Sequence, residues 1–248
     1  MNNQKLFWLH IRKSGGTSTR NRLPDSVYSK TDHYYAPRCF LQSDPADWND
    51  ILNNYRVVLG EYTFRRAQFA KKFLYKDNWD DLLSFAFSRE PLDRCLSMFY
   101  YVFWRNAEIG ARLLDSVRIY RSTGKATLTD SRAFDIFLDV LDECLNDEKK
   151  SIVSPNLHFR THISRMSLDV TDENGAVMLK RIYRLESMNG ALKEILGEFG
   201  LEALPPEETK RVMNKSKQKR FTPSREQIRK VEALYKDDFD IYENARVV

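Results

Sequence analysis

The sequence predicts an α/β fold, built as a doubly wound, mainly parallel sheet flanked by helices. Three observations predict it. Short apolar runs typical of buried parallel strands recur at residues 6–11, 56–61, 82–87 and 181–185. Segments with the apolar spacing of helices separate these runs. The 248 residues, 42% apolar and 30% charged, suffice for one domain with a full core, so we expect a single domain over residues 1–248.

Local signals predict the elements of the first part of the chain. The run at 6–11 is the first strand, and only a short helix over 19–23 fits before the next proline. Residues 43–45 combine a capping side chain with a proline at the first helical position, which predicts a helix to about residue 54. The apolar run at 56–61 predicts a short buried strand that ends on an acidic residue.

Residues 64–75 have helical spacing, with Phe69, Phe73 and Leu74 on the inward face. The outward face is then basic and carries Arg65, Arg66, Lys71 and Lys72. A solvated surface is the ordinary explanation of such a face, and contact with an anionic acceptor is the alternative.

The second part of the chain continues the alternation of strands and helices. Residues 82–87 predict a strand, and Pro91 then begins a helix. Further helices are predicted at residues 107–121, 131–146 and 187–199, and a final helix begins at residues 222–223 and carries apolar residues as far as Phe239. The helix at 131–146 places four apolar residues on one face: Phe134, Phe137, Leu138 and Leu141.

The first strand leads into a loop that reads Lys-Ser-Gly-Gly-Thr-Ser over residues 13–18. Two glycines let the backbone turn tightly and bring its N–H groups close to a ligand. Thr17 and Ser18 stand where the next helix begins, and there unpaired N–H groups and the helix dipole favour an anion. Lys13 adds a positive charge at the rim. The loop therefore predicts a phosphate or sulfate site, with a plain turn as the alternative.

The loop differs from that of the nucleoside triphosphatases, because GxxxxGK[ST] is absent and Lys13 precedes the glycines.

A second motif follows the strand at 82–87. Arg89 leaves the carboxyl end of that strand, where ligands bind in open α/β sheets. A guanidinium fork suits a phosphate dianion, and the hydroxyl of Ser97 in the following helix adds a donor. The alternative is a structural arginine at the start of a helix, with Ser97 serving only as a helical residue.

Taken together, the two motifs resemble those of sulfotransferases that use 3′-phosphoadenosine 5′-phosphosulfate (PAPS). The closest likeness is to the carbohydrate, Golgi-type sulfotransferases of family 2, whose loop reads K-T-G-G-T-S and whose second motif reads R-x-P-x-x-R-x-x-S-x-Y. The resemblance implies a P-loop-like fold. It also implies that the 5′-phosphosulfate binds Lys13, Ser14, Gly15, Gly16, Thr17 and Ser18. Arg89 and Ser97 would bind the 3′-phosphate.

The resemblance also suggests the catalytic residues. At the place of Gly60-Glu61-Tyr62 many carbohydrate sulfotransferases carry Gly-His and an aromatic residue, with the histidine as general base. Glu61 departs from this pattern, although a carboxylate can also take a hydroxyl proton. A structural ion pair of Glu61 is the alternative, and His33 and His10 are the alternative bases. Lys13 would offset the charge that develops on the leaving phosphate.

A basic run over residues 214–220 resembles the family's C-terminal loop that closes on the nucleotide. Ser216 and Lys217 are the contacts that this resemblance implies, and a solvated loop is the alternative. His158 and His162, four residues apart, would share a helix face and could bind metal. We favour packing or contact with the acceptor, because sulfuryl transfer needs no metal.

We therefore expect PAPS as co-substrate, PAP (adenosine 3′,5′-bisphosphate) as product, no metal, and a carbohydrate-type acceptor such as a glycan, glycolipid or glycosylated small molecule. The net charge of +5 suits an anionic ligand, and three scattered cysteines imply no disulfide framework. We expect no nucleic-acid partner and no membrane span. Because the first strand starts almost at residue 1, we expect a cytoplasmic enzyme.

Two other classes of protein stay open. A P-loop-like kinase would use ATP and magnesium. A non-catalytic binder of anionic glycan or nucleic acid would use a basic surface and would bind with steep salt dependence. The sequence leaves open the acceptor, the position sulfated, O- against N-sulfation and the oligomeric state.

Overall fold

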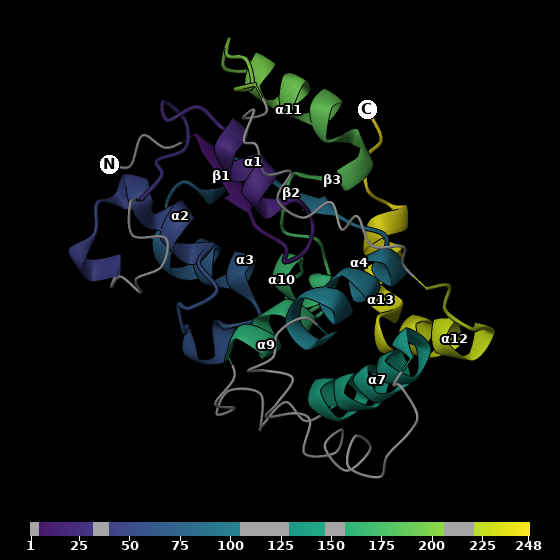
Figure 1. Cartoon of the computed structure of the whole chain (residues 1–248). Coiled ribbons are helices and arrows are strands. Elements are labelled where there is room, and N and C mark those ends of the chain that lie inside the picture. Colours follow the sequence, from purple (N-terminus) through teal and green to yellow (C-terminus); the bar gives the residue numbers. More distant parts are fainter. Residues whose placement is uncertain (1–4, 32–39, 105–128, 147–156, 206–220) are drawn as a thin grey trace. The chain divides into compact units, whose positions relative to one another are not determined.

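The computed structural model describes residues 5–31, 40–104, 129–146, 157–205 and 221–248 (Figure 1). The chain divides into two compact units. The first, called the sheet unit, comprises Met1–Glu90, Ser164–Glu207 and Asp237–Val248. The second, called the helical unit, comprises Pro91–Ile163 and Glu208–Lys236. The expectation of a single domain stays a prediction.

The sheet unit contains three parallel strands in the order β1 (Leu6–Leu9), β2 (Leu83–Ser88), β3 (Arg181–Arg184). The register pairs Leu6 with Leu83 and Phe85 with Arg181. Every side chain of β1 and β2 is buried, which explains why both strands are apolar runs without alternation. The predicted α/β fold and three of the predicted strands are confirmed.

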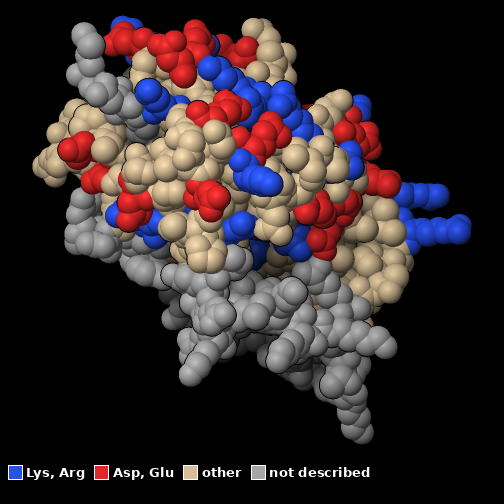
Figure 2. All heavy atoms as spheres, turned by 90° about the horizontal axis from the view of Figure 1, so that it is seen from above, with Lys and Arg blue, Asp and Glu red and all other residues tan. Residues whose placement is uncertain are grey.

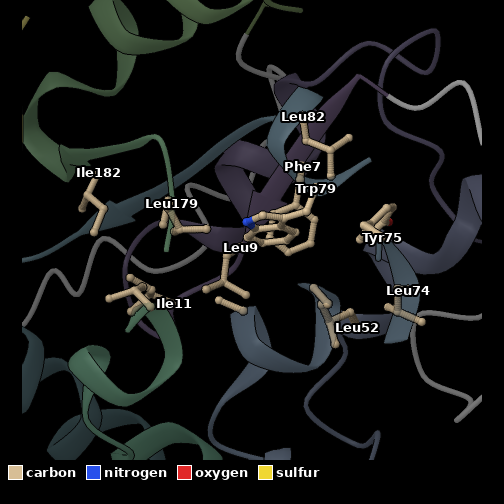
Figure 3. Packing of buried hydrophobic residues seen from close by; sticks show 14 of the residues in the cluster. Phe7, Leu9, Ile11, Leu52, Leu74, Tyr75, Trp79, Leu82, Leu179 and Ile182 are labelled. Carbon is tan, nitrogen blue, oxygen red and sulfur yellow. The ribbon is translucent and has the colours of Figure 1, made fainter. Parts of the chain in front are cut away.

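Both faces of the sheet are covered, because alternate residues of β1 enter different apolar clusters. Phe7 and Leu9 point into a cluster with residues of α2 (Trp48–Leu52), α3 (Arg66–Phe69) and α10 (Met166–Val170), as Figure 3 shows for its labelled members. Leu6 and Trp8 enter the other cluster with α11 (Met188–Gly197). In Figure 1 α11 accordingly lies on the opposite side of the strands from α2, α3 and α10.

Two further helices complete the sheet unit, and the C-terminal residues extend the sheet. Helix α1 (Gly16–Arg22) follows β1, and α13 (Lys236–Glu243) precedes the last residues. Arg246 then forms a parallel bridge beside β3, in which its N–H donates to the carbonyl of Ile182 at 2.8 Å. The carbonyl of Arg246 accepts from the N–H of Arg184 at 2.9 Å.

The helical unit is built from α4 (Pro91–Met98), a π-helical continuation (Phe99–Trp104), α7 (Asp130–Asn146), α9 (Leu157–Ile163) and α12 (Arg225–Leu234). Its core contains all four apolar residues predicted for one face of α7: Phe134, Phe137, Leu138 and Leu141. A capping box between Ser224 and Gln227 starts α12. The predicted helix at 107–121 lies outside the described residues.

The predicted strand at 56–61 is wrong. The segment turns and ends in a 3₁₀ helix (Gly60–Tyr62), with Gly60 at φ 58° and Val58 59% exposed. The cause lies in Thr63, whose hydroxyl donates to the Gly60 carbonyl at 2.7 Å and accepts from the Leu59 N–H at 3.1 Å. These local bonds compete with pairing in a sheet.

The predicted faces of the helix at 64–75 are partly wrong. Leu74 is buried as predicted, but Phe73 is 51% exposed and Arg66 is 1% exposed. The helix begins only at Arg66 and becomes a π-helix (Ala70–Leu74), closed by a bond of 2.8 Å from the Tyr75 N–H to the Ala70 carbonyl. The wider π-turn rotates the residues that follow it, so an α-helical period misplaces Phe73.

Other boundaries differ less. The short helix α1 begins at Gly16, three residues before the prediction. The helix predicted at 43–54 is confirmed as a 3₁₀ turn (Pro45–Asp47) followed by α2, with the Asp44 carboxylate accepting from the Ala46 N–H at 2.8 Å. The last helix is interrupted at Tyr235, between α12 and α13. Across the described ranges, no helix combines the length and apolarity that a membrane span requires.

Candidate functional site

The backbone of the loop between β1 and α1 enters the left-handed region twice. Lys13 has φ 66° and Gly15 has φ 78°, both in the left-handed region. Among the described residues Lys13 is the only non-glycine there, and such strain concentrates at ligand sites. A bond of 3.2 Å from the Ser14 N–H to the Ile11 carbonyl closes the first turn. The predicted loop is thus a defined structure, and Lys13 stands at its bend.

Helix α1 presents its first turn at the end of this loop. The N–H and the hydroxyl of Thr19 both donate to the Gly15 carbonyl, at 2.9 and 3.2 Å. The preceding N–H groups, those of residues 16–18, therefore come before the first hydrogen bond of the helix. Thr17 and Ser18 are exposed, whereas Thr19 is buried. The hydroxyls of Thr17 and Ser18 are thus open to a ligand.

The side chain of Ser14 is enclosed in the loop. It is 3% exposed, and its Oγ has no hydrogen-bond partner within the part of the chain that the structure describes. Buried hydroxyls in proteins are nearly always hydrogen-bonded, so this orphaned group fits a ligand that brings oxygen atoms into the loop.

Both glycines of the loop are required by their neighbours. A Cβ on Gly15 would lie 2.6 Å from the Leu185 Cδ1 and 2.6 Å from the Met188 Cε. A Cβ on Gly16 would overlap the ring of His10. That ring stacks on Trp8, with centroids 5.4 Å apart, and its Nδ1 is hydrogen-bonded to Arg12 Nη1. His10, an alternative base in the sequence, therefore packs inside the loop.

Arg89 connects the second motif to the loop. It follows β2 directly, is half-buried, and donates from Nη1 to the Lys13 carbonyl at 3.0 Å. The structure thus brings Arg89 together with residues 13–18, called the anion loop below, although the two lie far apart in the sequence. Ser97, the other residue predicted for the 3′-phosphate, is a half-buried residue of α4 in the helical unit. Its pairing with Arg89 stays a prediction.

Glu61 lies in the exposed 3₁₀ turn and next to an aromatic cluster. The rings of Tyr62 and Phe73 meet edge to face with centroids 5.5 Å apart. Lys72 Nζ donates to the Tyr62 hydroxyl at 2.8 Å and lies 5.4 Å from the Phe73 ring centroid. This hydrogen bond, followed by the charges of Tyr62 and Glu61, raises the pKa of Lys72. The Glu61 carboxylate, the Lys72 ammonium, the half-buried Tyr62 ring and the exposed Phe73 ring therefore lie near one another.

The two histidines of α9 do not form a metal site with other described residues. Their ring centroids are 4.2 Å apart, and the His162 Nδ1 lies 2.6 Å from the His158 carbonyl. Within the described ranges no three potential ligands gather. His33, Ser216 and Lys217 lie outside the described residues, so their roles stay predictions.

Sequence reasoning missed three buried polar residues of α2 and its C-cap. Asn49, Asp50 and Asn53 are each 1% exposed and hydrogen-bond to the segments on either side of the loop. The signal in the sequence was the pair of asparagines four residues apart, which share one helix face.

Comparison with protein families gives a match over nearly the whole chain. The family model described as "Sulfotransferase family" matches residues 2–244. No curated protein and no solved structure matches the chain. The matched range includes the anion loop, Arg89 and the Glu61 turn.

Proposed function

Since the chain belongs to the sulfotransferase family and is thus a transferase, we propose that it moves the sulfuryl group of PAPS to a carbohydrate-type acceptor. The observation that carries this proposal is the bond from Arg89 to the Lys13 carbonyl. It joins a guanidinium to a loop with a buried, unsatisfied Ser14 hydroxyl and with N–H groups that precede the first hydrogen bond of α1. A donor with a phosphosulfate and a second phosphate needs anion-binding groups of both kinds.

On this proposal the loop residues Lys13 to Ser18 bind the 5′-phosphosulfate. The unsatisfied Ser14 hydroxyl and the exposed hydroxyls of Thr17 and Ser18 supply donors, and the N–H groups of residues 16–18 add further ones. Arg89 binds the 3′-phosphate. The sequence resemblance adds three residues to those proposed to bind the nucleotide: Ser97, Ser216 and Lys217.

Transfer then proceeds in line. The acceptor oxygen attacks sulfur while the bond from sulfur to the bridging oxygen of the phosphate breaks, and PAP leaves. Glu61 takes the proton of the attacking hydroxyl, and its exposure leaves the carboxylate accessible to an acceptor. Lys13 offsets the negative charge that grows on the bridging oxygen, so its effect is largest in the transition state. The chain's contribution is alignment and charge stabilisation.

The surface beside Glu61 supports a carbohydrate-type acceptor. Tyr62 and Phe73 offer ring surface, and Lys72 and Tyr62 offer hydrogen-bonding groups at its edge. Binding sites that combine aromatic walls with a few placed polar groups suit a ligand with apolar faces and many hydroxyls.

The first test is calorimetric titration with PAP, with AMP and ATP as controls. Tight binding of PAP and weak binding of AMP is the expected result, because only PAP carries the 3′-phosphate. Equal affinity for PAP and AMP would contradict the donor assignment. A preference for ATP that requires magnesium would instead favour a kinase. If PAP binds, transfer of radioactive sulfate from PAPS to a panel of glycans, glycolipids and simple phenols tests the acceptor class.

A non-catalytic binder with a basic surface is less well supported. On the face seen in Figure 2, Lys and Arg side chains are interspersed with Asp and Glu. Ion pairs occur among the described residues as well: Arg181 lies against Glu198 and 3.5 Å from Glu194. Interspersed charge gives a weaker attraction for polyanions than a continuous basic patch does.

A further inference from the structure

Strand β1 lies at one edge of the three-stranded sheet, yet its outer backbone groups are bonded. The partners are amide side chains of two asparagines. Asn49 accepts from the Trp8 N–H at 2.9 Å and donates to the Trp8 carbonyl at 2.8 Å. Asn53 donates to the same carbonyl at 2.8 Å and accepts from the His10 N–H at 2.8 Å. The two side chains thus replace a neighbouring strand.

This replacement follows from the spacing of the residues. Trp8 and His10 are two apart, so their backbone groups face the same edge of the strand. Asn49 and Asn53 are four apart, so they lie on the same face of a helix. Two asparagines one helical turn apart can therefore bond to the backbone of Trp8 and His10, just before the anion loop. The His10 N–H, which Asn53 holds, is the last of these bonds before the loop turns at Ile11.

Asp50 holds the other side of the loop. Its two carboxylate oxygens accept from Arg20 Nε at 2.7 Å and Arg20 Nη2 at 2.8 Å, and Arg20 belongs to α1. The same carboxylate accepts from the Tyr28 hydroxyl at 2.9 Å and from both the N–H and the hydroxyl of Thr31 at 2.9 Å. All of its hydrogen-bonding capacity is used in a buried position, which fixes the geometry closely.

We propose that α2, together with its C-cap Asn53, holds the anion loop in the position that binds the donor. Asn49 and Asn53 hold the strand that enters the loop, and Asp50 holds the helix that leaves it. This inference rests on the proposed function, because it assigns the loop to the donor. The three residues touch neither donor nor acceptor on this account. They set the distance between the two ends of the loop, on which alignment of the phosphosulfate depends.

The test compares Asn53→Ala with Asn54→Ala. Asn54 is the adjacent residue, is 3% exposed, and accepts through its Oδ1 from the Arg56 N–H at 3.0 Å. Both variants remove a buried amide, and Asn53→Ala, which loses its bonds to the Trp8 carbonyl, the His10 N–H and the Tyr28 hydroxyl, is expected to lower the thermal midpoint at least as much. Turnover is therefore compared at a temperature well below both midpoints. Asn53→Ala alone is expected to lower turnover with PAPS, by about 10²-fold if the phosphosulfate shifts by an ångström. Equal turnover in the two variants would overturn the proposal.

A second pair of variants covers the case in which Asn53→Ala does not fold. Arg20→Lys keeps a positive charge but cannot make both bonds to Asp50. Arg22→Lys, in the same helix, alters a half-buried arginine that donates to the Asn189 side chain at 2.6 Å and to the Leu204 carbonyl at 3.3 Å. Turnover is expected to fall in Arg20→Lys and to stay near wild type in Arg22→Lys. Similar turnover in both would count against the positioning role.

Hydrogen exchange separates this inference from the proposed function, because it needs no nucleotide. The backbone amides of residues 13–18 are expected to exchange faster in Asn53→Ala than in Asn54→Ala. If wild type does not bind PAP, the donor assignment fails, and the exchange comparison still decides whether α2 positions the loop. Equal exchange in these amides would overturn the positioning role whatever the nucleotide result.

Discussion

At the scale of single residues, Lys13 combines two properties that most residues keep apart. Its side chain carries the charge proposed to stabilise the leaving group, while its backbone holds the left-handed turn and its carbonyl accepts from Arg89. Glycine would relieve the backbone strain but would remove the charge. A lysine in this strained conformation is what we expect if the function requires the charge of its side chain.

The first prediction separates these two properties of Lys13. Lys13→Ala and Lys13→Gly both remove the ammonium, so each is expected to lower turnover by about 10²–10³-fold. Lys13→Gly is also expected to raise the free energy of unfolding by about 1 kcal/mol relative to Lys13→Ala, because glycine accepts a positive φ without a Cβ clash. Steady-state kinetics and urea titration measure the two effects. Unchanged turnover in both variants would remove Lys13 from the mechanism.

A second prediction concerns Arg89. Arg89→Ala is expected to weaken PAP binding while leaving AMP binding nearly unchanged, because the 3′-phosphate distinguishes the two nucleotides. Arg89→Lys is expected to restore only part of the PAP affinity, since an ammonium lacks the planar fork. Calorimetric titration of both nucleotides against wild type and both variants checks this. Parallel losses for PAP and AMP would mean that Arg89 acts only by supporting the loop at Lys13.

The third prediction addresses the base. Glu61→Gln is expected to abolish most turnover and to leave the affinity for PAP unchanged, because the proposed role of the carboxylate is to take the acceptor's proton and not to bind the donor. The side chain is exposed, so the substitution should leave the unfolding midpoint near that of wild type. Activity and calorimetry on the same preparation decide the matter. Full activity in Glu61→Gln would point to a histidine, with His33 and His10 as the alternatives.

At the scale of elements, α2 shows how a short helix gains its place from polar contacts. Burial alone would raise the pKa of Asp50, but the hydrogen bonds from Arg20 and Thr31 and the charge of Arg20 lower it below its ordinary value. Burial, followed by the charge of Asp50, raises the pKa of Tyr28 well above its usual value. The ionised aspartate and the neutral phenol are therefore the forms that the folded protein stabilises.

The fourth prediction follows from the lowered pKa of Asp50. Its ionised form stabilises the folded protein above the pKa of the unfolded chain, about 4, and this contribution is lost as the pH falls through the lower folded pKa. Asp50→Asn is expected to lower the free energy of unfolding near neutral pH by about 2 kcal/mol and to flatten its decline below pH of about 4. Asp47→Asn, at the helix start, serves as control. If the free energy of unfolding falls equally steeply below pH of about 4 in wild type and in Asp50→Asn, the prediction is contradicted.

The strands of the sheet could be predicted because each one is a continuous apolar run, a signal contained in a few residues. The two wrong predictions, the strand at 56–61 and the faces of the helix at 64–75, have equally local causes that a hydrophobic pattern does not predict. The hydroxyl of Thr63 diverts residues 56–61 into a turn, and a π-turn at Ala70 changes the period of the next helix. Hydrophobic period alone therefore predicts elements well where no side chain bonds to the local backbone and the helix keeps its α-helical period.

At the scale of the whole molecule, the candidate site divides into predictable and unpredictable parts for a physical reason. The anion loop and Arg89 could be recognised, because each motif is a short stretch directly after a strand, and parallel strands bring their carboxyl ends to one edge. The spacing of Asn49 and Asn53 places them on one helix face, but their role could not be recognised, because it exists only if β1 lies at an edge of the sheet. Which strand lies at the edge depends on the whole fold.

The pairing of the strands also sets when the protein can begin to work during its synthesis. β1 leaves the ribosome before its neighbour β2, which follows more than 70 residues later, and β3 and Arg246 come later still. Such non-local contacts form slowly, and an apolar strand that waits for its partner is prone to aggregate. The anion loop also lacks Arg89 and Leu185 until those segments arrive. The proposed nucleotide site is therefore incomplete until β3 has been made, and truncated chains that stop before β3 are expected to be substrates for chaperones.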